Sequence, residues 1–201
     1  MKEVIEHYDK LIEENNDPFR DPEPLRTYMD KWDGQMFIDS MRLDKSKKVL
    51  EIGIGTGRIA DRVAPLCDIF YGIDLSPRTL ERASVNLNLH NNVKLLCGDF
   101  VMFEFVERFD VIYSTLTFMH IEDKLSAIRK VAELLNCDGL FVLSIDKNQN
   151  SFIDMGTRKI KIYPDTPENT INFIRAAGLH LTDKFETEHA HVFVSTKGPL
   201  V

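Results

Sequence analysis

The chain has 201 residues, of which 25 are Lys or Arg and 32 are Asp or Glu, so its net charge is −7. Its 43% hydrophobic and 28% charged content is typical of a globular protein and excludes a chain that is disordered throughout. Because a domain usually holds about 100–200 residues, we expect one domain over residues 1–201.

Charge and cysteine usage indicate the surroundings of the protein. The acidic balance disfavours a nucleic-acid partner, because polyphosphate repels a protein of the same sign. Acidic residues interrupt the N-terminus, and the longest uncharged run near the chain centre, residues 111–121, is too short to span a bilayer. Three widely spaced cysteines, Cys67, Cys97 and Cys137, predict free thiols. We therefore expect a cytoplasmic protein with no membrane partner.

Residues 1–45 are predicted to form a helical cap. The apolar pattern indicates a helix over residues 4–14. Three prolines, each preceded by an acidic residue, then interrupt the chain at Pro18, Pro22 and Pro24. We interpret this segment as a cap packed on the rest of the fold rather than as a separate domain.

Strand and helix patterns alternate from Val49 onward. Ser76 is a predicted N-cap, with Pro77 at the first helical position. Residues 158–163 alternate like an additional strand. The expected strands cover residues 49–52, 69–74, 93–97, 109–113, 140–145, 181–188 and 191–196, and the expected helices cover residues 58–66 and 123–135, with others beginning near Ser76 and Thr166.

This order of elements predicts an α/β fold. Strands that alternate with helices form a parallel sheet with helices on both faces. A short turn joins the last two predicted strands, so they are expected to pair as an antiparallel hairpin. We therefore predict a Rossmann-like, doubly wound, mainly parallel seven-stranded sheet with an antiparallel C-terminal edge hairpin.

A glycine-rich turn follows the first predicted strand. Glycine permits positive φ and close approach of a ligand, and the strand ends of an open parallel sheet are where ligands bind. The frame Gly55-x-Gly57-x-x-Ala60 also fits a dinucleotide-binding pattern. Asp74 ends the next strand and is positioned to accept hydrogen bonds from ribose hydroxyls. An NAD-dependent oxidoreductase is therefore an alternative at this point.

Three features argue against a nicotinamide cofactor. The glycines are spaced as Glu51-x-Gly53-x-Gly55-x-Gly57, with an acid inside the strand. Asp99 places another acid at the end of the third strand. The predicted strands finish in an edge hairpin, in the place where a dinucleotide-binding fold would have a second half to hold the nicotinamide. With these features, residues 49–197 resemble the class I S-adenosylmethionine-dependent methyltransferases.

The resemblance implies S-adenosylmethionine as cofactor and S-adenosylhomocysteine as product. Glu51 and the glycines of the loop, Gly53, Gly55 and Gly57, would face the methionine end of the cofactor. Ser114, just past the fourth predicted strand, would lie near the methionine and the sulfonium.

The resemblance also implies residues for the nucleoside end. Asp74 would hold the ribose hydroxyls, and Leu75 would pack on adenine. Asp99 would accept a hydrogen bond from the adenine amino group, helped by the backbone of Phe100. Tyr8 resembles an N-terminal tyrosine that closes over the cofactor in some small-molecule methyltransferases, with simple packing as the alternative.

The acceptor side is less well marked. Residues 114–122 lack the motifs of DNA, protein-glutamine and cytosine-carbon methyltransferases. Asp146 follows the fifth strand, but no acid ends the fourth to match it, so we expect no catalytic metal. His120 is the candidate general base, with packing as the alternative, and Arg58 is expected to pair with an acid on the surface.

We therefore predict an S-adenosylmethionine-dependent methyltransferase that transfers a methyl group to a small-molecule acceptor by in-line displacement. A non-catalytic S-adenosylmethionine-binding module stays open as an alternative, and so does a protein or RNA methyltransferase. The NAD-dependent alternative lacks a Tyr-x-x-x-Lys pair. The sequence does not specify the oligomeric state.

Overall fold

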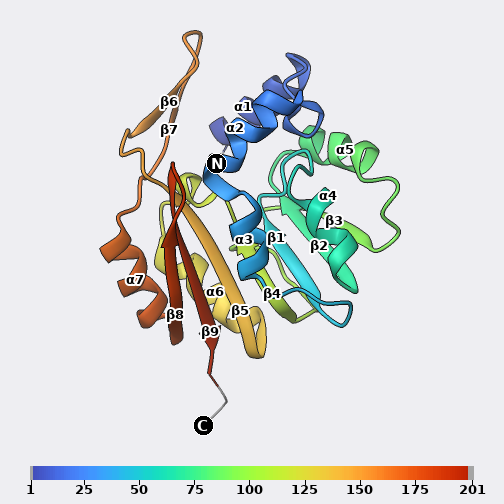
Figure 1. The fold of residues 1–201 in the computed structure, drawn as a ribbon. Helices are drawn as coiled ribbons and strands as arrows, with labels where there is room; N and C mark the ends of the chain where they lie inside the picture. The colour runs from blue at the N-terminus through green and yellow to red at the C-terminus, as the bar shows by residue number, and fades with distance from the viewer. Residues whose placement is uncertain (1, 199–201) are drawn as a thin grey trace.

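A seven-stranded sheet runs through the centre of the computed structural model, which describes residues 2–198 (Figure 1). Its strands lie in the order β3-β2-β1-β4-β5-β9-β8. The strands β1 to β5 are parallel, whereas β9 is antiparallel to both β5 and β8. The predicted fold class is confirmed. The strand bounds are β1 Lys48–Ile52, β2 Ile69–Asp74, β3 Val93–Cys97, β4 Phe109–Ser114, β5 Leu135–Asp146, β8 Leu179–Glu186 and β9 Ala190–Lys197.

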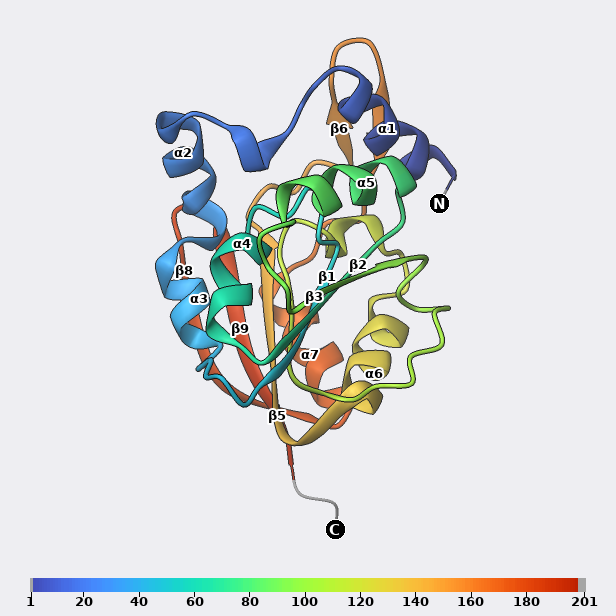
Figure 2. The same cartoon turned by 90° about the vertical axis from the view of Figure 1, so that its right-hand side faces the viewer.

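Helices cover both faces of this sheet (Figure 2). One layer consists of α3 Gln35–Ser40, α4 Ala60–Val63, the 3₁₀ turn η2 Ala64–Leu66 and α5 Pro77–Asn86. The opposite layer consists of α6 Lys124–Leu134 and α7 Pro167–Ala176. The predicted N-cap of α5 is confirmed, because the Ser76 hydroxyl accepts a hydrogen bond from the Thr79 amide at 3.0 Å.

The alternation of side chains along each strand creates two hydrophobic cores. Successive strand residues point to opposite faces, so neighbours along the chain enter different cores. Val49 and Val111 pack with α3, α4 and α5 on one face. Leu50 and Ile112 pack with α6 and α7 on the other. Because both faces are buried, the central strands are apolar almost throughout, as expected for a parallel sheet.

The N-terminal segment covers the end of the sheet where the parallel strands finish (Figure 1). It contains α1 Lys2–Glu13, the 3₁₀ turn η1 Pro18–Arg20 and α2 Glu23–Asp33, and it continues into α3. Phe37 of α3 is fully buried and lies edge-on to Tyr113 of β4, with ring centroids 5.9 Å apart. The segment is therefore packed into the same core as the sheet.

Three elements differ from the sequence-based predictions. The helix expected over residues 58–66 divides into α4 and η2, because Pro65 has no N–H to donate within a continuous helix. The strand β5 begins at Leu135, directly after α6, and a register shift against β4 accommodates its first residues. Residues 158–163 do not extend the sheet: β7 Lys159–Lys161 pairs with β6 Phe152–Asp154 in a separate hairpin. Within residues 2–198, none of the helices combines the length and the apolar character that a bilayer crossing needs.

Candidate functional site

A cavity of about 530 Å³ lies at the carboxyl ends of β1, β2 and β4, beneath α1. This is the edge of an open parallel sheet where ligands generally bind. Its walls bring together most of the residues that the sequence singled out, although they come from segments far apart in the chain. These lining residues are Tyr8, Glu51, Gly53, Gly55, Asp74, Leu75, Asp99, Phe100 and His120.

The glycine loop after β1 forms the floor of the cavity. Gly53 has φ +77°, and a Cβ there would lie 2.0 Å from Oγ1 of Thr117, so the position accepts only glycine. Gly55 has φ +57°, but a Cβ there would meet no atom within 4 Å. Since Gly55 lines the cavity, its bare backbone leaves room for a ligand to approach closely.

The Asp74 carboxylate, at the end of β2, holds the loop in this shape. Its Oδ2 accepts a hydrogen bond from the Gly55 amide at 2.9 Å, and its Oδ1 accepts one from the Ser76 amide at 3.0 Å. Burial raises the pKa of Asp74, and these backbone hydrogen bonds oppose that shift. A carboxylate offers about four lone-pair sites, so Asp74 retains acceptor capacity for ligand hydroxyls.

A mixed polar and apolar wall follows β3. Asp99 is half-buried, and its Oδ1 accepts a hydrogen bond from the Val101 amide at 2.7 Å. Phe100 is buried beside it, and Leu75 is half-buried on the β2 side. Apolar side chains next to a hydrogen-bond acceptor can hold a flat heterocycle that carries an amino group.

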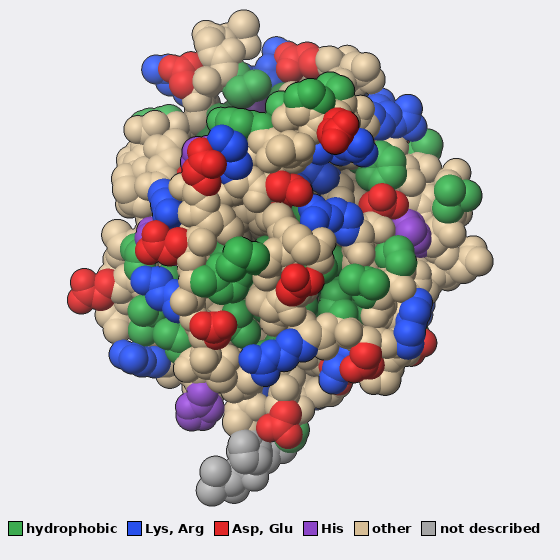
Figure 3. Space-filling model, in the orientation of Figure 1, with side chains coloured by type: hydrophobic (Ala, Val, Ile, Leu, Met, Phe, Trp, Pro, Cys, Tyr) green, Lys and Arg blue, Asp and Glu red, His purple; other side chains and the backbone are tan. Residues whose placement is uncertain are grey.

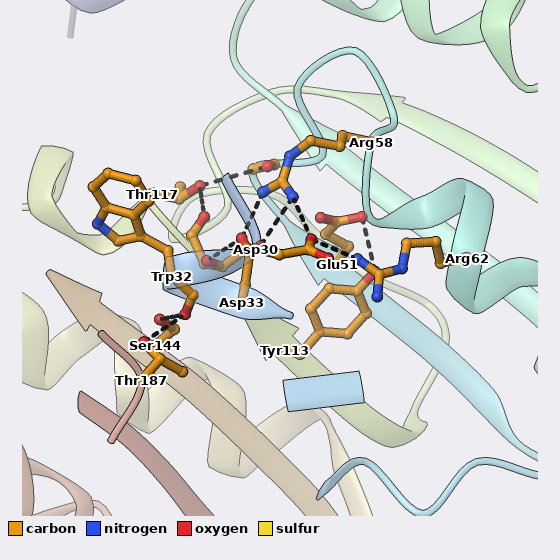
Figure 4. Close-up of polar contacts among 12 residues, drawn as sticks. Asp30, Trp32, Asp33, Glu51, Arg58, Arg62, Tyr113, Thr117, Ser144 and Thr187 are labelled. Atoms are coloured by element: carbon orange, nitrogen blue, oxygen red, sulfur yellow. Dashed lines mark hydrogen bonds and ion pairs between the residues drawn. The ribbon is translucent and has the colours of Figure 1, made fainter. Parts of the chain in front are cut away.

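A network of buried charges lies at the other end of the cavity (Figure 4). Asp33 of α2 is fully buried and binds Arg58 with both oxygens, at 2.9 and 2.5 Å. The Thr115 hydroxyl also donates to Asp33, at 2.8 Å. The Glu51 carboxylate accepts a hydrogen bond from the Tyr113 hydroxyl at 2.9 Å. Burial raises the pKa of Glu51 well above its usual range.

The prediction for Arg58 is only partly right. Its Nη1 lies 3.9 Å from the carboxylate of Asp30, which is 40% exposed, but its nearer partner is Asp33, whose side chain has no exposed area. The Asp33–Arg58 pair was not predicted, because nothing in the sequence connects an acid at the end of the cap to a basic residue after the glycine loop.

Two predicted cofactor residues lie outside the cavity lining. Gly57 faces Leu87 instead, and a Cβ there would lie 2.9 Å from Cδ1 of Leu87. Ser114 is fully buried, and its hydroxyl donates to the Ile52 carbonyl at 2.9 Å, which joins β4 to β1. Both residues lie behind the residues that line the cavity and do not contact it themselves.

Tyr8 of α1 extends down to His120, which ends the 3₁₀ turn η3 Phe118–His120. The Tyr8 oxygen lies 2.8 Å from Nε2 of His120. Burial lowers the pKa of His120 to about 4, so its imidazole is neutral at physiological pH. Burial raises the pKa of Tyr8, which keeps its hydroxyl protonated. Nδ1 of His120 is buried and has no hydrogen-bond partner among the described residues.

Polar contacts on two sides fix α1 over the cavity. The Ser76 hydroxyl donates to Asp9 at 2.6 Å. On the other side, Arg158 of the β6–β7 hairpin donates to Nδ1 of His7 at 2.9 Å and binds both oxygens of Glu14, at 2.7 and 2.8 Å. Sequence reasoning missed these roles of Asp9 and Arg158, because the partners are distant in the chain and follow no motif.

Comparison with known proteins agrees with this geometry. Residues 50–143 match the methyltransferase-domain family. The chain is 30% identical over 194 residues to an uncharacterized methyltransferase of Geobacillus thermodenitrificans, and the alignment covers 94% of this chain and 79% of that relative.

Solved structures share the fold. One is an S-adenosylmethionine-dependent methyltransferase from Clostridium acetobutylicum, with a TM-score of 0.70 and 16% identity over 98% of this chain and 99% of that one. Another is the N-methyltransferase NodS from Bradyrhizobium japonicum in complex with S-adenosylhomocysteine. Its TM-score is 0.70, and it is 19% identical over an alignment that covers 96% of this chain and 98% of that one.

The fold and the cavity define a methyltransferase of the Rossmann-like type. The chain belongs to the class I S-adenosylmethionine-dependent methyltransferase family. The site fits this cofactor on observations of its own. Open space at Gly55 admits a ligand, the acid Glu51 suits a positive sulfur, and the acceptor oxygens of Asp74 and Asp99 suit the hydroxyls and amino group of a nucleoside.

The Asp33–Arg58 pair gives a prediction about stability. Asp33→Ala leaves a guanidinium whose side chain is only 14% exposed without its main partner, so unfolding should become easier by about 3 kcal/mol. The control Glu13→Ala removes a carboxylate that is 56% exposed and pairs with Arg78, outside this network, so it should cost less than about 1 kcal/mol. Urea denaturation measures both free energies. Equal losses for the two variants would contradict this account.

The burial of His120 gives a prediction about pH. With a folded-state pKa of about 4, His120 stays neutral while the same residue in the unfolded chain takes up a proton near pH 6.5. Its contribution to stability is therefore present above pH 6.5 and is lost as the pH falls. Between pH 7 and pH 5 the loss should be about 2 kcal/mol. Urea unfolding of the wild type and His120→Gln at both pH values measures it, and identical pH dependence in the two proteins would refute it.

Proposed function

We propose that this methyltransferase acts on a small-molecule acceptor and that residues 1–201 form one domain with residues 1–45 as its cap. The observation that carries the proposal is the partial roof that α1 forms over the cavity. Tyr8 reaches across it to His120, and Asp9 and Arg158 hold α1 in place. A cavity covered in part by a helix suits an acceptor that is taken inside, whereas a polymer needs a long open groove.

The surface charge supports the same choice over RNA. On the face drawn in Figure 3, Lys and Arg side chains are interspersed with Asp and Glu. The whole chain has a net charge of −7, so long-range attraction to polyphosphate is absent on average. The free thiols of Cys67, Cys97 and Cys137 support a cytoplasmic location.

Methyl transfer requires mainly that the protein align the acceptor with the methyl group. When bound, S-adenosylmethionine supplies a methyl carbon that its positive sulfur has already made electrophilic, so the reaction as proposed needs no metal. The chain holds the acceptor in line with the methyl–sulfur bond and keeps water out through the cap. Glu51, Gly53 and Gly55 face the methionine end in this proposal. The nucleoside end lies between Asp74, Leu75, Asp99 and Phe100.

His120 is the proposed base for an acceptor that must lose a proton. Its neutral imidazole can take up that proton, and the Tyr8 hydroxyl can accept a hydrogen bond from the Nε2–H tautomer. In that tautomer Nδ1 is the proton acceptor. It has no hydrogen-bond partner among the described residues but is buried, so the acceptor must displace the side chains that cover it. Tyr8 is then a positioning residue, because it acts through His120.

Cofactor binding can be tested separately from catalysis. Asp74→Ala removes hydrogen-bond acceptors of the proposed ribose site, and each hydrogen bond to a charged acceptor contributes about 1.5–3 kcal/mol. The affinity for S-adenosylhomocysteine should therefore fall at least about tenfold. His120→Ala should leave this affinity nearly unchanged. Calorimetric titration measures both. A loss in His120→Ala as large as that in Asp74→Ala would refute our division of the cavity into cofactor and acceptor sides.

The acceptor is tested by turnover. A metabolite extract is fractionated, and release of S-adenosylhomocysteine from S-adenosylmethionine is followed with and without a chelator. We expect activity on a low-molecular-mass fraction that survives the chelator. If His120 is the base, His120→Ala should lower turnover by about 10²–10⁴-fold. Activity confined to protein or RNA fractions would refute the small-molecule proposal, and a loss below tenfold would assign His120 to packing.

A further inference from the structure

A second cavity, of about 380 Å³, adjoins the cofactor cavity. Leu116 and Thr117, which follow β4, line both cavities and form the wall between them. The second cavity continues along the end of β5 at Ser144 and Asp146 and reaches the β6–β7 hairpin. It therefore lies beyond the carboxyl ends of β4 and β5 and is separated from the proposed methyl-donor site only by these two residues.

The lining of this cavity combines carboxylates with apolar walls. Three of its residues are the acids Asp146, Asp154 and Asp165, and none of its described lining residues is Lys, Arg or His. The apolar part includes Phe118 and Phe152, and Phe152 is 53% exposed. Such a cavity favours a ligand that has both an apolar body and a positive charge.

The neighbouring cations single out one of the three acids. Asp165 forms an ion pair with Lys124 at 3.0 Å, and Asp154 forms one with Lys159 at 3.0 Å. Asp146 forms no ion pair with any described residue, and its Oδ1 accepts only the Asn148 amide, at 2.7 Å. The adjacent Lys147 does not neutralise it, because that ammonium binds Glu186 and the Thr187 carbonyl. A cationic ligand is therefore expected at Asp146.

We propose that the second cavity is the subsite for the part of the acceptor that does not react, and that this part is a small amphipathic group with an ammonium. Asp146 binds the ammonium, and the apolar body packs against Met119 and Phe152, while the atom that accepts the methyl group lies past Leu116 and Thr117. This inference rests on the proposed function and narrows it from small molecules in general to hydrophobic amines.

The test uses full-length protein saturated with S-adenosylhomocysteine and three probes of similar shape but different charge: phenethylamine, phenethyl alcohol and hydrocinnamate. Calorimetry should show that the amine binds at least tenfold more tightly than the alcohol, with the carboxylate weakest. Asp146→Asn keeps the shape and the Asn148 contact but removes the charge. It should reduce amine affinity at least tenfold and leave alcohol affinity unchanged.

Matched variants separate a local effect from a general loss of negative charge. Asp154→Asn should reduce amine affinity less than threefold, because Lys159 already balances that carboxylate. Glu133→Gln, an exposed residue of α6, should change nothing. A last titration repeats the amine measurement in the presence of magnesium ion, because carboxylates also bind divalent cations. Magnesium should not compete with the amine.

The outcomes distinguish a failure of this inference from a failure of the proposed function on which it rests. Absence of S-adenosylhomocysteine binding to the wild type would overturn both. Cofactor binding with no amine binding, with equal affinity for amine and alcohol, or with a preference for the carboxylate would overturn only the acceptor subsite. Unchanged amine affinity in Asp146→Asn, or displacement of the amine by magnesium, would overturn it as well.

Discussion

The buried ion pair between Asp33 and Arg58 is the constraint on which the arrangement of this site depends. It joins three segments of the fold, because Asp33 ends α2, Arg58 follows the glycine loop, and the Thr115 hydroxyl that also binds Asp33 follows β4. A charge pair removed from water is stable only when its hydrogen bonds are satisfied, so this geometry tolerates little displacement. The cap, the glycine loop and the segment after β4 are thereby fixed relative to one another.

Electrostatics then favours positive ligands on both sides of the wall formed by Leu116 and Thr117. Glu51, Asp74 and Asp99 line the cofactor cavity. Desolvation raises the pKa values of Glu51 and Asp74, which is the cost of burying carboxylates without a full set of partners. In the proposed orientation the sulfonium lies on the Glu51 side, where its positive charge offsets this cost, and the nucleoside provides hydrogen-bond donors to Asp74 and Asp99. The same principle applies at Asp146 in the second cavity, where a carboxylate again has no ion-pair partner among the described residues.

The local parts of the fold and site could be predicted from the sequence. The alternation of strands and helices, the N-cap at Ser76 and the glycine loop with Asp74 each depend on residues close together in the chain. The rest depends on geometry that the sequence does not encode locally. Which glycine faces the ligand is decided by the path of the loop, which brings Gly55 to the cavity and Gly57 to Leu87. The pairing of Ser114 with Ile52, and of Arg58 with Asp33, appears only once distant segments are packed.

The position of β9 has a consequence for how the chain folds during synthesis. β9 lies between β5 and β8 in the sheet, although among the strands of residues 2–198 it comes last in the chain. Until residues 190–197 emerge from the ribosome, the side of β5 that β9 covers offers free backbone N–H and C=O groups to other chains. A nascent chain that already holds the glycine loop and β1 to β5 is therefore exposed to edge-to-edge association, and only completion of the C-terminal hairpin ends that exposure.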